Sequence, residues 1–162
     1  MISGGSICFT KVSKFQGFEG FKVGKASKWV RMAPTEEMMA RSYRDLLVWQ
    51  KARALASRVY RETEKFPKSE IYGLTSQMRR AAVSVASNIA EGQGRLTPGE
   101  FRQFLGHSRG SLLELSTQLA IASDLGFVDE ETCTSVEHDA YQVLGLLNRL
   151  LESLCNPRPM AI

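Results

Sequence analysis

From residue 42 towards the C-terminus, apolar residues recur every three or four positions, which is the spacing of one face of an α-helix. Proline or glycine marks the expected ends of the first three helices, at Pro67, at Gly92 with Gly94, and at Gly126. It ends at Asn156 and Pro157. The sequence therefore predicts four long helices, roughly over residues 43–66, 70–91, 97–126 and 129–156.

Connections of about three to six residues would join these helices, and short connections force consecutive helices to run antiparallel. No stretch alternates as a β-strand would. The start of the third helix carries the clearest local signal, because Thr97 can cap it, Pro98 suits its first turn and Glu100 completes a capping box. Asp129 is expected to cap the fourth helix. The predicted fold class is all-α, an antiparallel up-down-up-down four-helix bundle over residues 42–156.

The two ends of the chain differ from this central part. Residues 1–40 contain six Lys or Arg against three Asp or Glu, and glycines are spaced through them. We expect residues 1–41 to form a flexible basic N-terminal extension, either an arm that binds nucleic acid or a tail without a fixed structure. Residues 157–162 would be a short C-terminal tail.

Charge is divided unevenly along the chain. Residues 41–110 hold thirteen basic and six acidic side chains, whereas residues 111–162 hold two basic and eight acidic ones. The fourth predicted helix also carries more apolar residues between positions 143 and 154 than one core-facing side needs. Both features favour self-association, with the basic side of one subunit against the acidic side of the next.

The sequence offers no set of residues for catalysis. A di-iron site in a helix bundle needs paired Glu-x-x-His motifs, but Phe104 stands three residues before His107 and Ser135 three before His138. The short Gly92-Gln93-Gly94 stretch lacks the remaining glycine and lysine of a phosphate-binding loop. We therefore expect a protein that is not an enzyme and has neither a metal site nor a cofactor.

The cysteines and the hydropathy bear on localisation. The chain has three cysteines, an odd number without CxxC spacing, which is typical of reduced thiols. No apolar run reaches the roughly 18 residues that span a bilayer, and the N-terminus lacks the apolar stretch of a secretory signal. These features predict a cytoplasmic protein with no membrane partner.

Two groups of side chains are candidates for function. The first is a polar stripe on the second helix, which we expect to form a structural hydrogen-bond network: Ser84, Asn88 and Glu91. The second is a group of basic residues that could contact nucleic-acid phosphates: Arg79, Arg80, Arg95, Arg102 and Arg109. The alternative for the second group is pairing with acidic residues of a neighbouring subunit, for which the candidates are Glu130, Glu131, Glu137 and Asp139.

A family resemblance is carried by residues 43–46, 48–52, 72–82, 87–92 and 101–119, followed by Leu125-Gly126. These stretches resemble the four-helix bundle proteins encoded in intervening sequences of bacterial 23S ribosomal RNA genes. The resemblance covers residues 42–155 and implies a bundle that assembles as a homopentamer. It also extends to accessory variability proteins of diversity-generating retroelements, which are basic pentamers that bind a reverse transcriptase and nucleic acid.

These observations lead to two hypotheses about function. In the first, the chain is a non-enzymatic, ring-forming bundle that binds structured RNA or DNA through its basic face. Its partners would be itself, RNA or DNA, and a reverse transcriptase or other protein. In the second, it is an oligomeric protein–protein interaction scaffold without nucleic-acid binding, and its basic half is used in the subunit interface.

Overall fold

The computed structural model describes residues 42–155, and every regular element within this range is helical. Two short 3-10 helices, η2 (Tyr43–Asp45) and η3 (Lys68–Ile71), precede the first and second long helices. The long helices are α2 (Leu47–Thr63), α3 (Leu74–Gln93), α4 (Pro98–Asp124) and α5 (Glu130–Cys155). The predicted all-α helical bundle is confirmed, whereas the predicted N-terminal extension and C-terminal tail lie outside the described residues.

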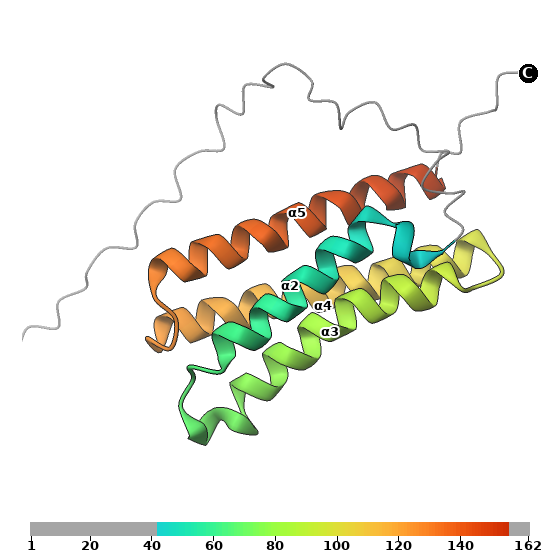
Figure 1. Cartoon of the computed structure of the whole chain (residues 1–162). Helices are drawn as coiled ribbons and strands as arrows, with labels where there is room; N and C mark the ends of the chain where they lie inside the picture. Colours follow the sequence, from blue (N-terminus) through green and yellow to red (C-terminus); the bar gives the residue numbers. More distant parts are fainter. Residues whose placement is uncertain (1–41, 156–162) are drawn as a thin grey trace, which may run out of the picture. The chain divides into compact units, whose positions relative to one another are not determined.

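Each long helix packs against its neighbours in the chain, and α2 also packs against α5. Along the α2–α5 pair, Lys51 contacts Gln142 and Arg58 contacts Asp139, so residue numbers rise on one helix as they fall on the other. The connections between consecutive helices lie at alternate ends of the bundle (Figure 1). Neighbouring helices therefore run antiparallel, as expected from short connections.

The core is built from the apolar stripes of the four helices. Each helix contributes side chains that are almost completely buried, for example Leu55, Val85, Leu112 and Leu147. Burying one such side chain stabilises the fold by about 1.5–3 kcal/mol. Most of the additional apolar residues predicted on α5 pack against the core of the same chain. They are the half-buried Leu144, Leu146, Leu151 and Leu154.

The first two long helices begin later than predicted. Ser42 and Asp45 form a capping box around η2, and Leu46 then adopts an extended conformation, so α2 begins at Leu47. Similarly, Glu70 lies outside α3, and its carboxylate accepts a hydrogen bond from the Leu74 backbone N–H at 3.0 Å. In both cases a polar side chain accepts hydrogen bonds from free backbone N–H groups at or before the start of the long helix. The helix therefore begins after this polar residue and does not include it.

The predicted signals at the other helix ends are confirmed in large part. Thr97 caps α4 by accepting from the Glu100 N–H at 3.2 Å, although the Glu100 carboxylate accepts from the Thr97 hydroxyl rather than from its backbone N–H. Gly126 has a φ of 71° and ends α4 with two hydrogen bonds, from its own N–H to Ser123 and from the Phe127 N–H to Ala122. This pattern is a Schellman motif, which requires a left-handed residue.

The prediction that Gly92 and Gly94 end α3 is confirmed for Gly94 and wrong for Gly92. The helix continues to Gln93, and Gly94 is its C-cap. Gly92 is buried against α4, where an added Cβ would lie 2.7 Å from the Phe104 Cβ and 2.9 Å from the Phe101 Cδ2. This glycine is needed for the close approach of two helices rather than for a turn.

Candidate functional site

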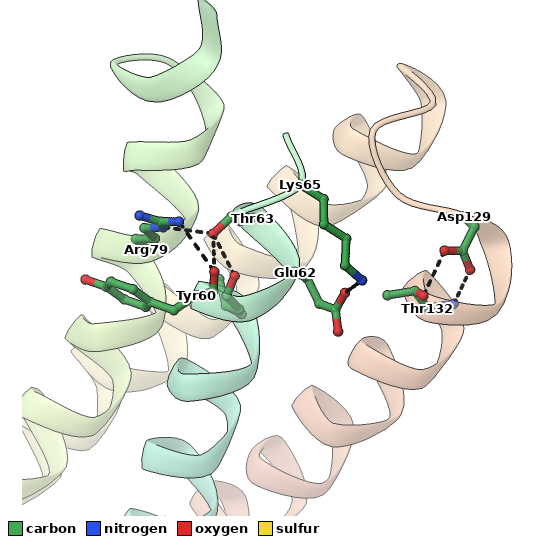
Figure 2. Close-up of polar contacts among 8 residues, drawn as sticks. Tyr60, Glu62, Thr63, Lys65, Arg79, Asp129 and Thr132 are labelled. Atoms are coloured by element: carbon green, nitrogen blue, oxygen red, sulfur yellow. Dashed lines mark hydrogen bonds and ion pairs between the residues drawn. The ribbon is translucent and has the colours of Figure 1, made fainter. Parts of the chain in front are cut away.

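The five arginines predicted to contact nucleic acid occupy different structural environments. Arg79, on α3, reaches across to the end of α2 (Figure 2). Its Nε donates to the Thr63 hydroxyl at 2.8 Å, a terminal nitrogen donates to the Tyr60 carbonyl at 3.4 Å, and the guanidinium lies 4.8 Å from the Tyr60 ring centroid. Arg79 therefore holds α3 against α2.

Arg95 is also held by contacts within the chain. Its guanidinium pairs with the Glu91 carboxylate one helical turn earlier and lies 4.5 Å from the Phe104 ring centroid. This pairing removes Glu91 from the polar network predicted with Ser84 and Asn88. The ion pair is exposed, so it contributes little to stability.

Arg80, Arg102 and Arg109 have exposed side chains and, within residues 42–155, no carboxylate at ion-pairing distance. Arg102 makes one weak contact, at 3.5 Å from the Cys155 Sγ of α5. Arg109 lies seven residues after Arg102 and so shares its helix face. We call these three residues the free arginines, because their charge is available to a ligand.

The structure does not bring the five predicted arginines together on one surface. Helix α3 lies beside α2 and α4, and α5 lies on the other side of α4. Arg79 contacts α2 from α3, whereas Arg102 contacts α5 from α4. The two arginines therefore contact different helix pairs, and the five predicted residues do not form one patch.

The polar network exists, but its membership differs from the prediction. The hydroxyls of Ser84 and Ser111 lie 2.9 Å apart and link α3 to α4, while the Asn88 amide donates to the Ser84 hydroxyl at 3.0 Å and to its carbonyl at 2.8 Å. One turn away, the buried Ser108 hydroxyl donates to the Val85 carbonyl at 2.9 Å. Neither serine of α4 was predicted as a member of this network, although Ser108 falls at helical spacing between the apolar Leu105 and Leu112.

Part of the acidic half of the chain is already paired with the basic half. Asp139 of α5 accepts from Arg58 of α2 at 2.6 Å, and Arg58 also donates to the Ser135 carbonyl. Asp139 is thereby engaged within its own chain, which leaves Glu130, Glu131 and Glu137 of the four acidic residues predicted to pair with a neighbour.

The pKa shifts belong to groups that hold the ends of helices or pair with a neighbouring side chain. Asp129 caps α5, where the backbone N–H of Thr132 donates at 2.8 Å and its hydroxyl at 2.9 Å (Figure 2). These bonds lower the pKa of Asp129. A hydrogen bond from Lys65 to Glu62 raises the pKa of Lys65, and one with the Tyr43 hydroxyl raises the pKa of Arg44.

An aromatic and basic hollow at the start of α2 was missed by the sequence analysis. It has a volume of about 440 Å³ and is lined by Tyr43, Arg44, Trp49, Gln50 and Arg53. The four-residue spacing of Trp49 and Arg53 could have indicated it, because residues four apart share a helix face. The position of Tyr43 beside them depends on the η2 turn and could not be read from helix periodicity.

A second hollow, of about 750 Å³, lies over the start of α5 and is lined by polar and acidic residues, among them Glu130, Glu131 and His138.

Among the residues that the structure describes, no three His, Cys, Asp or Glu side chains are grouped so that they could hold a metal ion. None of the described helices is long and apolar enough to cross a bilayer.

The fold and these surfaces define a helix-bundle protein with a polar α3–α4 contact and exposed, unpaired arginines. Residues 44–149 match the family model of 23S rRNA-intervening sequence proteins, and the chain belongs to this family.

One solved structure resembles this fold, with a TM-score of 0.60 and 18% sequence identity. It is a protein of unknown function from the S23 ribosomal protein family of Bacteroides thetaiotaomicron VPI-5482. The alignment covers 65% of this chain and 99% of that one. No curated protein is detectably similar to this sequence.

Proposed function

We propose that this chain is a non-enzymatic, self-associating bundle protein that binds structured RNA or DNA through the free arginines. The observation that carries the proposal is that Arg80, Arg102 and Arg109 are exposed and lack a carboxylate partner within the described residues.

The physical basis is the release of counterions from phosphates. A guanidinium without a carboxylate partner can approach a phosphate without first breaking an ion pair. Such contacts hold the phosphate backbone and do not read sequence. Each one is weak, but a homopentamer would present five copies, and simultaneous contacts would raise the affinity by avidity.

A second candidate function is an oligomeric scaffold that binds only proteins. It is favoured by Leu113 and Ile121 of α4, which are 52% and 45% exposed and lie on one helix face because they are eight residues apart. A second copy of the chain is the occupant we propose for this face.

In either case we place the protein in the cytoplasm, and a reverse transcriptase is the protein partner suggested by the resemblance to the retroelement accessory proteins.

Charge reversal of two free arginines tests nucleic-acid binding. The full chain is titrated into a labelled RNA stem-loop and a matched DNA duplex by fluorescence polarisation across a salt series. We expect affinity to fall steeply with salt, and Arg102→Glu with Arg109→Glu to weaken binding at least tenfold, because two phosphate contacts become repulsive.

The matched control is Arg61→Glu with Lys68→Glu, which changes the net charge equally on an exposed part of α2 and η3. This pair should weaken binding much less. An equal loss in both double variants would show that only net charge matters, and the assignment of the site would then be wrong. No binding of either ligand at low salt would exclude nucleic acid and leave the scaffold function.

A further inference from the structure

The hollow at the start of α2 has the composition of a site for an unpaired nucleotide. The Tyr43 and Trp49 rings lie edge to face, with centroids 5.1 Å apart and planes 71° apart. Both rings are half-buried against the core, which fixes their positions. The capping box of Ser42 and Asp45 holds the η2 turn that carries Tyr43. The aromatic pair is thus a rigid platform at the rim of the fold.

Two cations flank this platform. The Arg44 guanidinium lies 5.8 Å from the Tyr43 ring centroid, and the Arg53 guanidinium lies 5.4 Å from that of Trp49. Both arginines are exposed, and neither has a carboxylate at ion-pairing distance within residues 42–155. Their charge is therefore held beside the rings and remains available for an anion.

A polar group completes the hollow. The Gln50 amide nitrogen donates to the Arg44 carbonyl at 2.8 Å, which fixes the side chain, and its amide oxygen has no partner among the described residues. This oxygen can accept a hydrogen bond from the amino group of a base. The volume of about 440 Å³ lies within the range of about 300–1,000 Å³ that is usual for small-ligand sites.

We propose that this hollow binds one unpaired nucleotide of an RNA or DNA strand, with its base stacked on the Trp49 ring, Tyr43 against the edge of the base, and its phosphates at Arg44 and Arg53. Aromatic rings together with arginines are how proteins hold unstacked bases, whereas a base inside a duplex cannot reach a ring. The inference rests on the proposed nucleic-acid function and adds to it a preference for unpaired nucleotides. An acidic peptide would use the two arginines but not the ring faces.

Tryptophan fluorescence gives a direct test in the full chain. Trp29 is the only other tryptophan, so Trp29→Phe leaves Trp49 as the single tryptophan, whose emission can be excited selectively over that of tyrosine. Titration with an unlabelled single-stranded RNA should quench Trp49 emission as the base stacks. A blunt RNA duplex with the same number of phosphates should bind with little quenching, because its bases are paired.

Substitutions in the hollow separate this site from the free arginines. Trp49→Leu should weaken single-strand binding about tenfold and duplex binding much less, given the usual contribution of base stacking, while Trp49→Phe should retain most of the affinity. Arg53→Gln should reduce the single-strand salt slope by about 0.7. The matched control is Arg61→Gln, the same change in an exposed residue about two turns further along α2 and outside the hollow.

Circular dichroism checks that each variant is folded. If Trp49→Leu unfolds, the salt slope of Arg53→Gln and the quenching of Trp49 emission still test whether the hollow binds a nucleotide. Polarisation that reports RNA binding without any change in Trp49 emission would overturn this site and leave the proposed function intact. Quenching by a glutamate-rich peptide but not by RNA would assign the hollow to a protein partner and overturn the inference. Absence of any RNA or DNA binding would remove both proposals together.

Discussion

At the scale of single residues, Gly92 illustrates how one residue without a side chain allows two helices to pack closely. The absence of a Cβ lets α3 approach the Phe101 and Phe104 side chains of α4. Glycine is common at helix ends, so the position of Gly92 after an apolar stripe predicts a helix end there. Burial of Gly92 inside α3 shows the opposite role, and the difference depends on a neighbour that is not adjacent in the sequence.

Gly92→Ala should destabilise the bundle by up to about 2 kcal/mol, because overpacking against the two phenylalanines costs about 1–3 kcal/mol and the gain in helix propensity offsets about 1 kcal/mol of that cost. Urea unfolding followed by circular dichroism measures the change. The matched control is Gly145→Ala on α5, where a Cβ would meet no atom within 4 Å, so we expect a gain of up to about 1 kcal/mol. An equally stable Gly92→Ala variant would show that α4 can shift to accommodate the methyl group.

At the scale of elements, the helices are delimited by side chains that satisfy backbone groups at their ends. The Asp129 carboxylate accepts two hydrogen bonds from Thr132 at the start of α5 (Figure 2). Those bonds favour the ionised form and lower its pKa below the ordinary value of 3.8. A carboxyl whose pKa is lower in the folded state stabilises the fold above its unfolded pKa, and this contribution is lost as the pH falls through the folded pKa.

Asp129→Ala should therefore lower the unfolding free energy at neutral pH, with a difference from the parent chain that shrinks as the pH falls below 3.8. Urea unfolding at a series of pH values checks both statements. Asp124→Ala is the control, because Asp124 is exposed at the C-terminal end of α4, where a negative charge is unfavourable. A difference for Asp129→Ala that stays constant down to the lowest pH would mean that its charge does not matter.

At the scale of the whole molecule, the basic and acidic parts of the sequence become neighbours within one chain. Helix α2 lies beside α5, and Arg58 pairs with Asp139 across this contact. Folding therefore brings part of the basic charge beside part of the acidic charge within one chain. For this reason the charge asymmetry along the sequence is weaker support for a subunit interface than the sequence alone indicates. The exposed apolar face of α4 is the better candidate for self-association.

Leu113→Glu with Ile121→Glu should convert the oligomer that we propose into monomers, because two buried apolar contacts per subunit would be replaced by charges. Sedimentation velocity of the full chain measures the change, with homopentamer as the expected parent species. Leu96→Glu is the control, since Leu96 is 98% exposed in the α3–α4 connection and its substitution should leave the oligomer intact. A monomeric parent chain would overturn the ring, and a variant that stays oligomeric would place the interface elsewhere.

The candidate site was predicted only in part. Arg80, Arg102 and Arg109 have exposed side chains, whereas Arg79 is committed to Thr63 and Tyr60, which lie on another helix. Residues on one helix can be assigned to a face from their spacing. Contacts between helices depend on rotation and register, which the spacing does not give.

The sequence by itself determined the number of long helices, their apolar stripes and the caps at Thr97, Gly126 and Asp129. Each of these depends on interactions within a few residues: the 3.6-residue repeat, a side chain three positions from a free N–H, or a left-handed glycine. Only the tertiary structure decided which arginines are free, why Gly92 is glycine and how Tyr43 comes beside Trp49 and Arg53. Those outcomes require parts of the chain separated by turns or whole helices to meet, and local periodicity carries no information about where they meet.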